Sequence, residues 1–136
     1  MRSIYRYILL FAAVLTLQGC THNDGGPHEL YGQWKLMSME KDGINVPGYT
    51  GNIFWSFQSS TIEMKEVKFM NEVSRNFGNF RLTDQTLYLS FPYDDFIPPV
   101  ILGLPREAEM EVVSLKGSEM ILSYGTPATF YTFHRW

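Results

Sequence analysis

The sequence predicts an all-β fold, an eight-stranded antiparallel up-and-down barrel, on three observations. From residue 30 onward, apolar and polar residues alternate with period two, as they do in half-buried strands. Turn-forming residues interrupt this alternation at intervals of about 8 to 12 residues, and no amphipathic segment reaches the length of a helix. The chain of 136 residues has room for one domain. Closure into a barrel would remove the exposed sheet edges that promote aggregation.

Each candidate strand is identified by its alternation and by the turn that follows it. In the first strand, Trp34 and Leu36 share one face, and Asp42-Gly43 supplies the turn. The eight candidate strands are residues 30–39, 52–58, 61–68, 77–82, 86–91, 108–115, 119–124 and 128–136.

The second and third strands carry more of the expected core. Trp55 and Phe57 alternate with polar side chains in the second strand. In the third, the alternation shifts frame between Met64 and Val67, which predicts a β-bulge there.

The later strands form hairpins. The fourth and fifth are joined around Asp84, and Leu87 and Leu89 share a face of the fifth. The sixth and seventh are joined at Gly117, because glycine can adopt the positive φ of a tight hairpin. Leu122 lies on the expected inner face of the seventh strand.

Residues 92–105 interrupt the alternation. Four prolines remove ladder donors, so this segment is not a central strand. Burial of a large apolar side chain contributes about 1.5 to 3 kcal/mol, so the apolar group here should cover something: Phe96, Ile97, Val100, Ile101, Leu102 and Leu104. Three interpretations stay open, namely a plug at one end of the barrel, a lid over a ligand cavity, and an apolar surface for a partner or membrane.

The N-terminal residues indicate export and lipid attachment. Arg2 and Arg6 precede an apolar run, residues 7–17, that suits a signal peptide but is shorter than the roughly 20 residues that span a bilayer. The motif LQGC, which ends at Cys20, resembles the bacterial lipobox, whose cysteine is acylated and becomes the new N-terminus. The alternative is an ordinary secreted protein with a stray cysteine near its cleavage site.

We therefore expect three parts: a lipoprotein signal peptide over residues 1–19, a flexible tether with lipidated Cys20 over residues 20–29, and the barrel over residues 30–136. Palmitate is an expected acyl chain on Cys20, and several chains together would hold the protein on the membrane. The expected location is the envelope of a Gram-negative bacterium, at the outer membrane, with the periplasmic or surface side left open.

The charge and cysteine content exclude other classes. Removal of residues 1–19 would take away two arginines and lower the formal charge from -3 to -5. Such a chain offers no basic field for nucleic acid, so no nucleic-acid partner is expected. A single cysteine cannot form an internal disulfide.

Motifs for catalysis, cofactor binding and metal binding are missing from the sequence. It has no G-x-S-x-G elbow, phosphate loop or cysteine–histidine pairing. The spacing of His22, His28 and His134 resembles no zinc site. Asp94-Asp95 is interpreted as a solvated turn, with paired carboxylates at a cavity rim as the alternative. We expect no catalytic residue, cofactor or metal, and an enzyme that uses the barrel mouth is a third hypothesis.

Gly32-Gln33-Trp34 on the first strand and Arg135 on the last resemble the pattern of the lipocalins, which belong to the calycins. In that pattern a G-x-W motif is covered by an arginine from the end of the barrel. The resemblance is strongest to the small lipocalin-like domains of bacterial envelope lipoproteins. It implies that the planar Arg135 guanidinium packs over the Trp34 indole and that Gly32 permits close backbone approach. A core aromatic without a special partner is the alternative for Trp34.

The resemblance implies a non-catalytic barrel that can bind a small hydrophobic ligand. An eight-stranded barrel is just wide enough to hold one small ligand or to be filled by its own side chains. The second case would make the protein a structural module or one that contacts another envelope protein. The alternation places these expected ligand-lining residues on the inner face: Trp55, Phe57, Leu87, Leu89 and Leu122.

Overall fold

The alternating segments form one curved sheet in the computed structural model, which describes residues 27–93 and 98–136. The described residues also include three short 3-10 turns. They are η1 (Pro27–Glu29), before the first strand; η2 (Phe69–Asn71), between the fourth and fifth strands; and η3 (Val100–Leu102), between the sixth and seventh strands. The strands are β1 (Gly32–Lys41), β2 (Ile44–Asn45), β3 (Ile53–Gln58), β4 (Thr61–Val67), β5 (Val73–Thr83), β6 (Thr86–Ser90), β7 (Glu107–Lys116), β8 (Glu119–Tyr124) and β9 (Thr129–Arg135).

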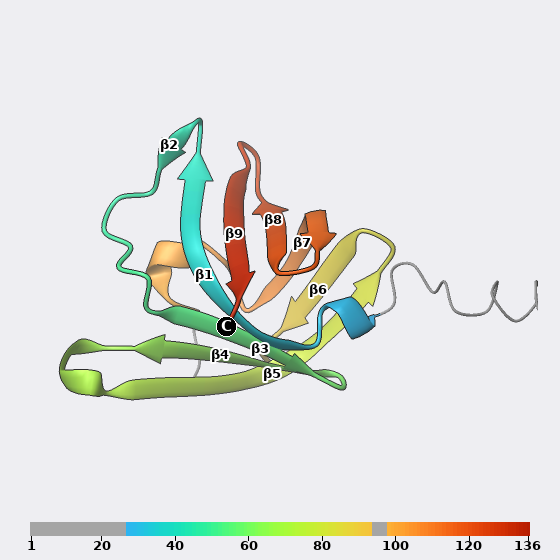
Figure 1. Cartoon of the computed structure of the whole chain (residues 1–136), viewed down its shortest axis with the longest axis horizontal. Helices are drawn as coiled ribbons and strands as arrows, with labels where there is room; N and C mark the ends of the chain where they lie inside the picture. Colours follow the sequence, from blue (N-terminus) through green and yellow to red (C-terminus); the bar gives the residue numbers. More distant parts are fainter. Residues whose placement is uncertain (1–26, 94–97) are drawn as a thin grey trace, which may run out of the picture.

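The sheet closes on itself. Across the described residues, its nine strands follow the order β2-β1-β3-β4-β5-β6-β7-β8-β9, and β1 also pairs with β9 (Figure 1). All of these pairs are antiparallel. Because β2 has only two residues and flanks the end of β1, the barrel itself has eight strands. The predicted eight-stranded antiparallel up-and-down barrel is therefore confirmed.

The two ends of the barrel differ. At one end β1 begins, β9 finishes, and short turns join β3 to β4, β5 to β6 and β7 to β8; we call this the closed end. The opposite end carries the long connections from β2 to β3 and from β6 to β7, and we call it the loop end. In Figure 1 the green β4–β5 hairpin extends to the left, and η2 forms its tip.

The core follows the period-two pattern. Large side chains that point inward are almost fully buried, with Trp34, Trp55 and Leu87 at 0% exposure. Gly78 is required where β5 meets β6, because a Cβ there would lie 2.4 Å from the Ser90 carbonyl oxygen. Aromatic and aliphatic residues from all eight barrel strands contribute to this core, so folding removes a continuous apolar surface from water.

The prediction of a β-bulge between Met64 and Val67 was wrong. The pairing of β4 with β3 and with β5 is regular throughout. The apparent frame shift arises because Val67 points outward, opposite Val73 on β5. The register shifts lie elsewhere, between Leu36 and Ser38 in β1 and between Val112 and Ser114 in β7.

The fourth predicted strand was too short at its start. β5 begins at Val73, four residues before the predicted boundary. In this extension Ser74 and Asn76 take the inward-facing positions, while Val73 and Phe77 are exposed. Ser74, Arg75 and Asn76 are three polar residues in succession, so the period-two pattern that identifies a strand is lost here.

The proline-rich segment divides into buried and exposed parts. Leu102 and Leu104 are buried, Ile101 is half-buried, and Val100 is 92% exposed. The segment therefore covers part of the core with Leu102 and Leu104, as its apolar content predicted, and leaves Val100 in water. Phe96 and Ile97 lie outside the described residues.

Candidate functional site

The closed end is built around Arg135. Its guanidinium carbon lies 4.3 Å from the centre of the Trp34 ring, within cation–π distance. Its nitrogens donate hydrogen bonds to three backbone carbonyls: Nε to Gly117 at 3.0 Å, Nη1 to Tyr31 at 2.7 Å, and Nη2 to Glu29. One side chain thus joins the segment before β1, the β7–β8 turn and the end of β9.

Gly32 makes room for this arrangement. Its φ of +117° is favourable for glycine and rare for other residues. A Cβ at this position would lie 3.0 Å from Nη1 of Arg135. The structure therefore brings together the three residues that the resemblance grouped, Gly32, Trp34 and Arg135.

The Trp34 indole is satisfied on its other edge. Its Nε1 donates to the Leu30 carbonyl at 2.8 Å, and both side chains are fully buried. A buried indole N–H usually needs such an acceptor. Trp34 is therefore fixed from above by Arg135 and at its rim by the chain that leads into β1.

The interior beyond Trp34 is strongly aromatic. Trp55 lies beside Trp34 in the β1–β3 register, and its ring centre is 4.8 Å from Phe133 and 6.4 Å from Phe57. Phe57 in turn makes an edge contact with Phe80 at 5.0 Å. The five expected inner-face residues are all buried: Trp55, Phe57, Leu87, Leu89 and Leu122.

One polar atom in this interior lacks a partner. Nε1 of Trp55 is inaccessible to solvent and makes no hydrogen bond with any residue in the described ranges. Leaving a buried donor unpaired costs about 1 to 3 kcal/mol. An oxygen acceptor of a bound molecule would remove that cost.

At the loop end, the hydroxyls of two tyrosines form hydrogen bonds between connecting segments and barrel strands. The Tyr131 hydroxyl, on β9, donates to the Leu102 carbonyl of η3. The Tyr49 hydroxyl donates to the Leu36 carbonyl, beside the register shift of β1, and accepts from the Ile53 N–H at 3.3 Å. Burial raises the pKa of Tyr49 and the pKa of Tyr131 to about 12 each. Both hydroxyls therefore remain protonated donors at neutral pH.

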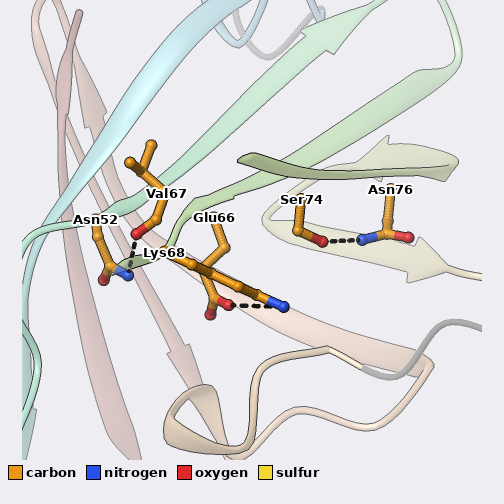
Figure 2. A network of polar contacts seen from close by, with 6 residues as sticks. All are labelled: Asn52, Glu66, Val67, Lys68, Ser74 and Asn76. Carbon is orange, nitrogen blue, oxygen red and sulfur yellow. Dashed lines mark hydrogen bonds and ion pairs between the residues drawn. The ribbon is translucent and has the colours of Figure 1, made fainter. Parts of the chain in front are cut away.

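Towards the same end, the inward-facing positions of β4 and β5 change from apolar to polar. Met64 pairs with Asn76 and Glu66 with Ser74 across these strands. Figure 2 shows the polar contacts at this edge: Asn76 Nδ2 donates to Ser74 Oγ at 3.1 Å, and Lys68 Nζ lies 3.9 Å from Glu66 Oε1. We call Glu66, Lys68, Ser74 and Asn76 the polar rim.

Asn52 fixes the polar rim to β3. Its Nδ2 donates to the Val67 carbonyl at 2.9 Å (Figure 2). The Asn52 backbone carbonyl accepts from the Val67 N–H at 2.9 Å. This two-point contact holds the start of β3 against the end of β4. An apolar interior with convergent polar groups at one edge is the usual composition of a small-molecule site.

Two grooves lie on the outer face of the barrel. One, of about 500 Å³, runs over β5, β6 and β7 between Arg81, Tyr88 and Glu107. The other, of about 260 Å³, lies over β3, β4 and β5 near Glu63 and Phe77. Neither is lined by Trp55 or by the polar rim.

Other candidate groups lie apart from the interior. His134 is exposed and contacts Glu119 at 3.3 Å. Residues 27–93 and 98–136 hold no group of three or more His, Cys, Asp and Glu side chains that could bind a metal ion. The same ranges contain no helix long and apolar enough to cross a membrane. Cys20, His22 and Asp94-Asp95 lie outside the described residues.

Sequence reasoning missed the polar rim and both tyrosine contacts. Tyr49 lies in the connection after Pro47 and Gly48, where no alternation indicates which way a side chain points. Ser74 and Asn76 resemble solvent-facing residues of any loop. A polar pair at successive inward positions of a strand becomes informative only when the strand's register is known.

Comparison with known proteins relates this barrel to a protein family. A family model described as a lipocalin-like domain matches residues 14–135. No curated protein sequence matches the chain significantly.

Two solved bacterial structures share the fold. A lipocalin-like protein from Bacteroides uniformis is similar with a TM-score of 0.69 and 19% sequence identity, over 79% of this chain and 99% of that chain. An uncharacterized protein from Bacteroides eggerthii is similar with a TM-score of 0.65 and 19% identity, over 78% of this chain and 98% of that one. About four fifths of this chain thus correspond to nearly the whole of each solved chain.

Proposed function

Because the chain belongs to the lipocalin-like domain family, we propose that it is a lipid-anchored envelope protein whose barrel binds a small apolar or amphipathic molecule. The ligand is non-covalently held and no chemistry is performed on it. The unpaired indole N–H of Trp55 carries this proposal, because it is a fully buried donor without an acceptor among apolar core residues.

The ligand class follows from the residues around that donor. Trp55, Phe57 and Phe133 offer aromatic surface to a hydrocarbon or ring system. Nε1 of Trp55 can only donate, so the ligand needs an oxygen acceptor such as a carboxylate or carbonyl. The polar rim could bind a second polar group of the ligand, at the loop end of the barrel. Together these features favour an amphipathic molecule over a pure hydrocarbon.

Residues 21–136 offer a direct test of ligand binding. A fragment of this kind should fold alone, because solved relatives consist almost entirely of the matching region. Native mass spectrometry of the fragment purified from cells should show a co-purified lipid-sized adduct. Absence of the adduct, together with no saturable binding of a fluorescent fatty acid, would contradict the proposal.

Trp55→Phe tests the donor itself. It keeps an aromatic ring in the core but deletes the N–H. We expect roughly fivefold weaker binding of the fatty acid, the loss of about 1 kcal/mol for one hydrogen bond, and unchanged binding of a probe without oxygen. Trp136→Phe is the matched control, since Trp136 is an exposed residue outside the core. Equal binding by Trp55→Phe and wild type would count against the assigned donor.

The lipid anchor is proposed from the sequence alone. Residues 1–19 serve as the signal peptide, and acylated Cys20 attaches the chain to the outer membrane. The tether, residues 20–29, ends where Arg135 donates to the Glu29 carbonyl. In cells given labelled palmitate, the wild-type protein should take up label and Cys20→Ala should not, and the variant should be found in the soluble fraction. Equal labelling of both proteins would exclude this attachment.

The close aromatic contacts of the interior favour a second candidate. Trp55 and Phe133 are 4.8 Å apart between ring centres, which suits a barrel filled by its own side chains. Such a barrel would act as a structural module or as a partner of another envelope protein. This candidate predicts apo protein without an adduct in the mass spectrum and a specific protein partner in cross-linking at the membrane.

A further inference from the structure

A row of basic and aromatic side chains crosses the outer face of the barrel. The register places Lys35 of β1 opposite Phe54 of β3, Phe54 opposite Lys65 of β4, and Lys65 opposite Arg75 of β5. Side chains of directly paired residues lie on the same face of a sheet. Four residues that are distant in the sequence therefore form one line, which we call the basic–aromatic row.

The C-terminal Trp136 extends this row. Its ring makes an edge contact with Phe54 at 5.5 Å, and Lys35 Nζ lies 4.4 Å from its centre. Lys65 Nζ lies 4.9 Å from the Phe54 ring. Aromatic faces attract these ammonium groups without neutralising their charge. Within residues 27–93 and 98–136, neither lysine nor Arg75 lies within ion-pair distance of a carboxylate.

Exposed apolar side chains continue the same face towards the tip of the β4–β5 hairpin. Val73 and Phe77 flank Arg75 at alternate positions of β5, with Val73 on the side of the tip, and both are about half exposed. At the tip, Phe69 is 89% exposed and Met70 is 82% exposed. Met70 also has a φ of +63°, a left-handed conformation that is unusual for a long side chain. Large apolar side chains held in water in this way mark interaction sites.

We propose that this outer face of β3, β4 and β5 docks on an anionic lipid bilayer. Lysine and arginine near such a surface are attracted to acidic headgroups, and tryptophan and phenylalanine favour the boundary between headgroups and acyl chains. The chain as a whole is acidic, with a formal charge of -3. Three of its 11 lysines and arginines nevertheless lie in one line with Phe54 and Trp136. Basic residues beside aromatic ones are the combination that favours interfacial membrane binding.

The acidic residues nearby leave this charge distribution in place. Glu66 lies at an inward-facing position, where it contacts Lys68, and is therefore on the other side of the sheet from Lys65. Glu63 lies on the outer face in the adjacent row, opposite Phe77. Glu72 precedes β5 at the hairpin tip. The docking face thus has cations at its centre and isolated carboxylates at its margins.

This docking is independent of ligand binding and of the acyl anchor. It supplies a second, reversible contact with the membrane, and it would turn the β3–β5 side of the barrel towards the lipid. A test therefore needs protein without acyl chains, for which residues 21–136 serve, since solved relatives consist of the matching region.

Tryptophan fluorescence gives a site-specific measurement. All three tryptophans of the chain lie in the described part, where Trp34 and Trp55 are fully buried and Trp136 is 69% exposed. Vesicles that contain phosphatidylglycerol should shift the emission of Trp136 to shorter wavelength and sediment the protein, whereas pure phosphatidylcholine vesicles should do neither. Trp136→Phe should abolish the shift while sedimentation persists. If the protein bound neither kind of vesicle, the proposal would be overturned.

Paired substitutions locate the face. Lys65→Gln with Arg75→Gln should weaken sedimentation by tenfold or more, because each basic residue near the surface is worth roughly fivefold. Lys41→Gln with Lys116→Gln changes the net charge equally at exposed positions outside the row and should have a much smaller effect. Phe69→Ser with Met70→Ser should weaken binding and leave its salt dependence unchanged. Equal losses in both lysine-containing pairs, or binding to an acidic protein but not to vesicles, would refute a lipid-docking face.

Discussion

The guanidinium carbon of Arg135 lies 4.3 Å from the centre of the Trp34 ring because the two residues are paired across β1 and β9. Closure of the barrel and the cation–π contact are thus parts of one structural event. Pairing of the first and last barrel strands places Arg135 beside the indole and within reach of the three carbonyls around it.

Arg135→Lys should lower the free energy of unfolding by about 1 to 2 kcal/mol. Lysine keeps the positive charge but cannot donate to three carbonyls in the planar geometry of arginine. Urea denaturation followed by tryptophan fluorescence measures the effect. Arg75→Lys, at an exposed position on β5, is the control and should be nearly neutral. Equal stability of Arg135→Lys and wild type would show that the guanidinium geometry is unimportant.

Trp34→Ala should destabilise the barrel by about 3 to 5 kcal/mol, since it removes a fully buried aromatic residue and leaves a cavity. It also removes the donor to the Leu30 carbonyl. Trp136→Ala deletes the same side chain at a largely exposed position and should cost far less. A near-zero effect of Trp34→Ala in chemical denaturation would contradict its role as the anchor of the closed end.

Gly32→Ala should be destabilising for two separable reasons. The first is the φ of +117°, and the second is the 3.0 Å approach of the new Cβ to Nη1 of Arg135. In a double-mutant cycle with Arg135→Ala, part of the cost of Gly32→Ala should disappear, because the contact is gone and the backbone strain remains. Gly103→Ala isolates backbone strain, since a Cβ there meets nothing within 4 Å. Additive costs in the cycle would exclude a steric conflict with Arg135.

Stability should fall as the pH rises from about 10 to about 12. Tyr49 and Tyr131 have folded-state pKa values of about 12, raised by burial above the value of 10.0 expected for an unfolded chain. Below pH 10 the two hydroxyls are protonated in both the folded and the unfolded state, so their contribution to stability is complete. Above pH 10 the hydroxyls lose their protons first in the unfolded state, which shifts the equilibrium towards unfolding. Unfolding free energies across this range measure the loss.

Tyr131→Phe should make that pH dependence shallower and should also remove the donor to the Leu102 carbonyl. Tyr93→Phe, at an exposed position, serves as the control and should leave the profile unchanged. A wild-type profile that stays flat up to pH 12 would show that neither hydroxyl is protected in the folded state.

Most of the barrel could be predicted from the sequence, and the failures have a common cause. Alternation identified the inward-facing Trp55, Leu87 and Leu122 because each points into an apolar core. It failed at the β4–β5 hairpin, where Val67 and Val73 face outward and Ser74 faces inward. The pattern assumes that the apolar side of a strand is the buried side, and this hairpin breaks that assumption.

By itself, the sequence determined the fold class, the strand segments and the face on which most side chains lie, because these depend on neighbours two residues apart. It also grouped Gly32, Trp34 and Arg135, through a resemblance. Only the tertiary structure decided the register in which neighbouring strands pair. Pairing across β1, β3, β4 and β5 aligns Lys35, Phe54, Lys65 and Arg75, which the chain separates. Register depends on turn lengths and on closure of the whole sheet, so no local pattern specifies it.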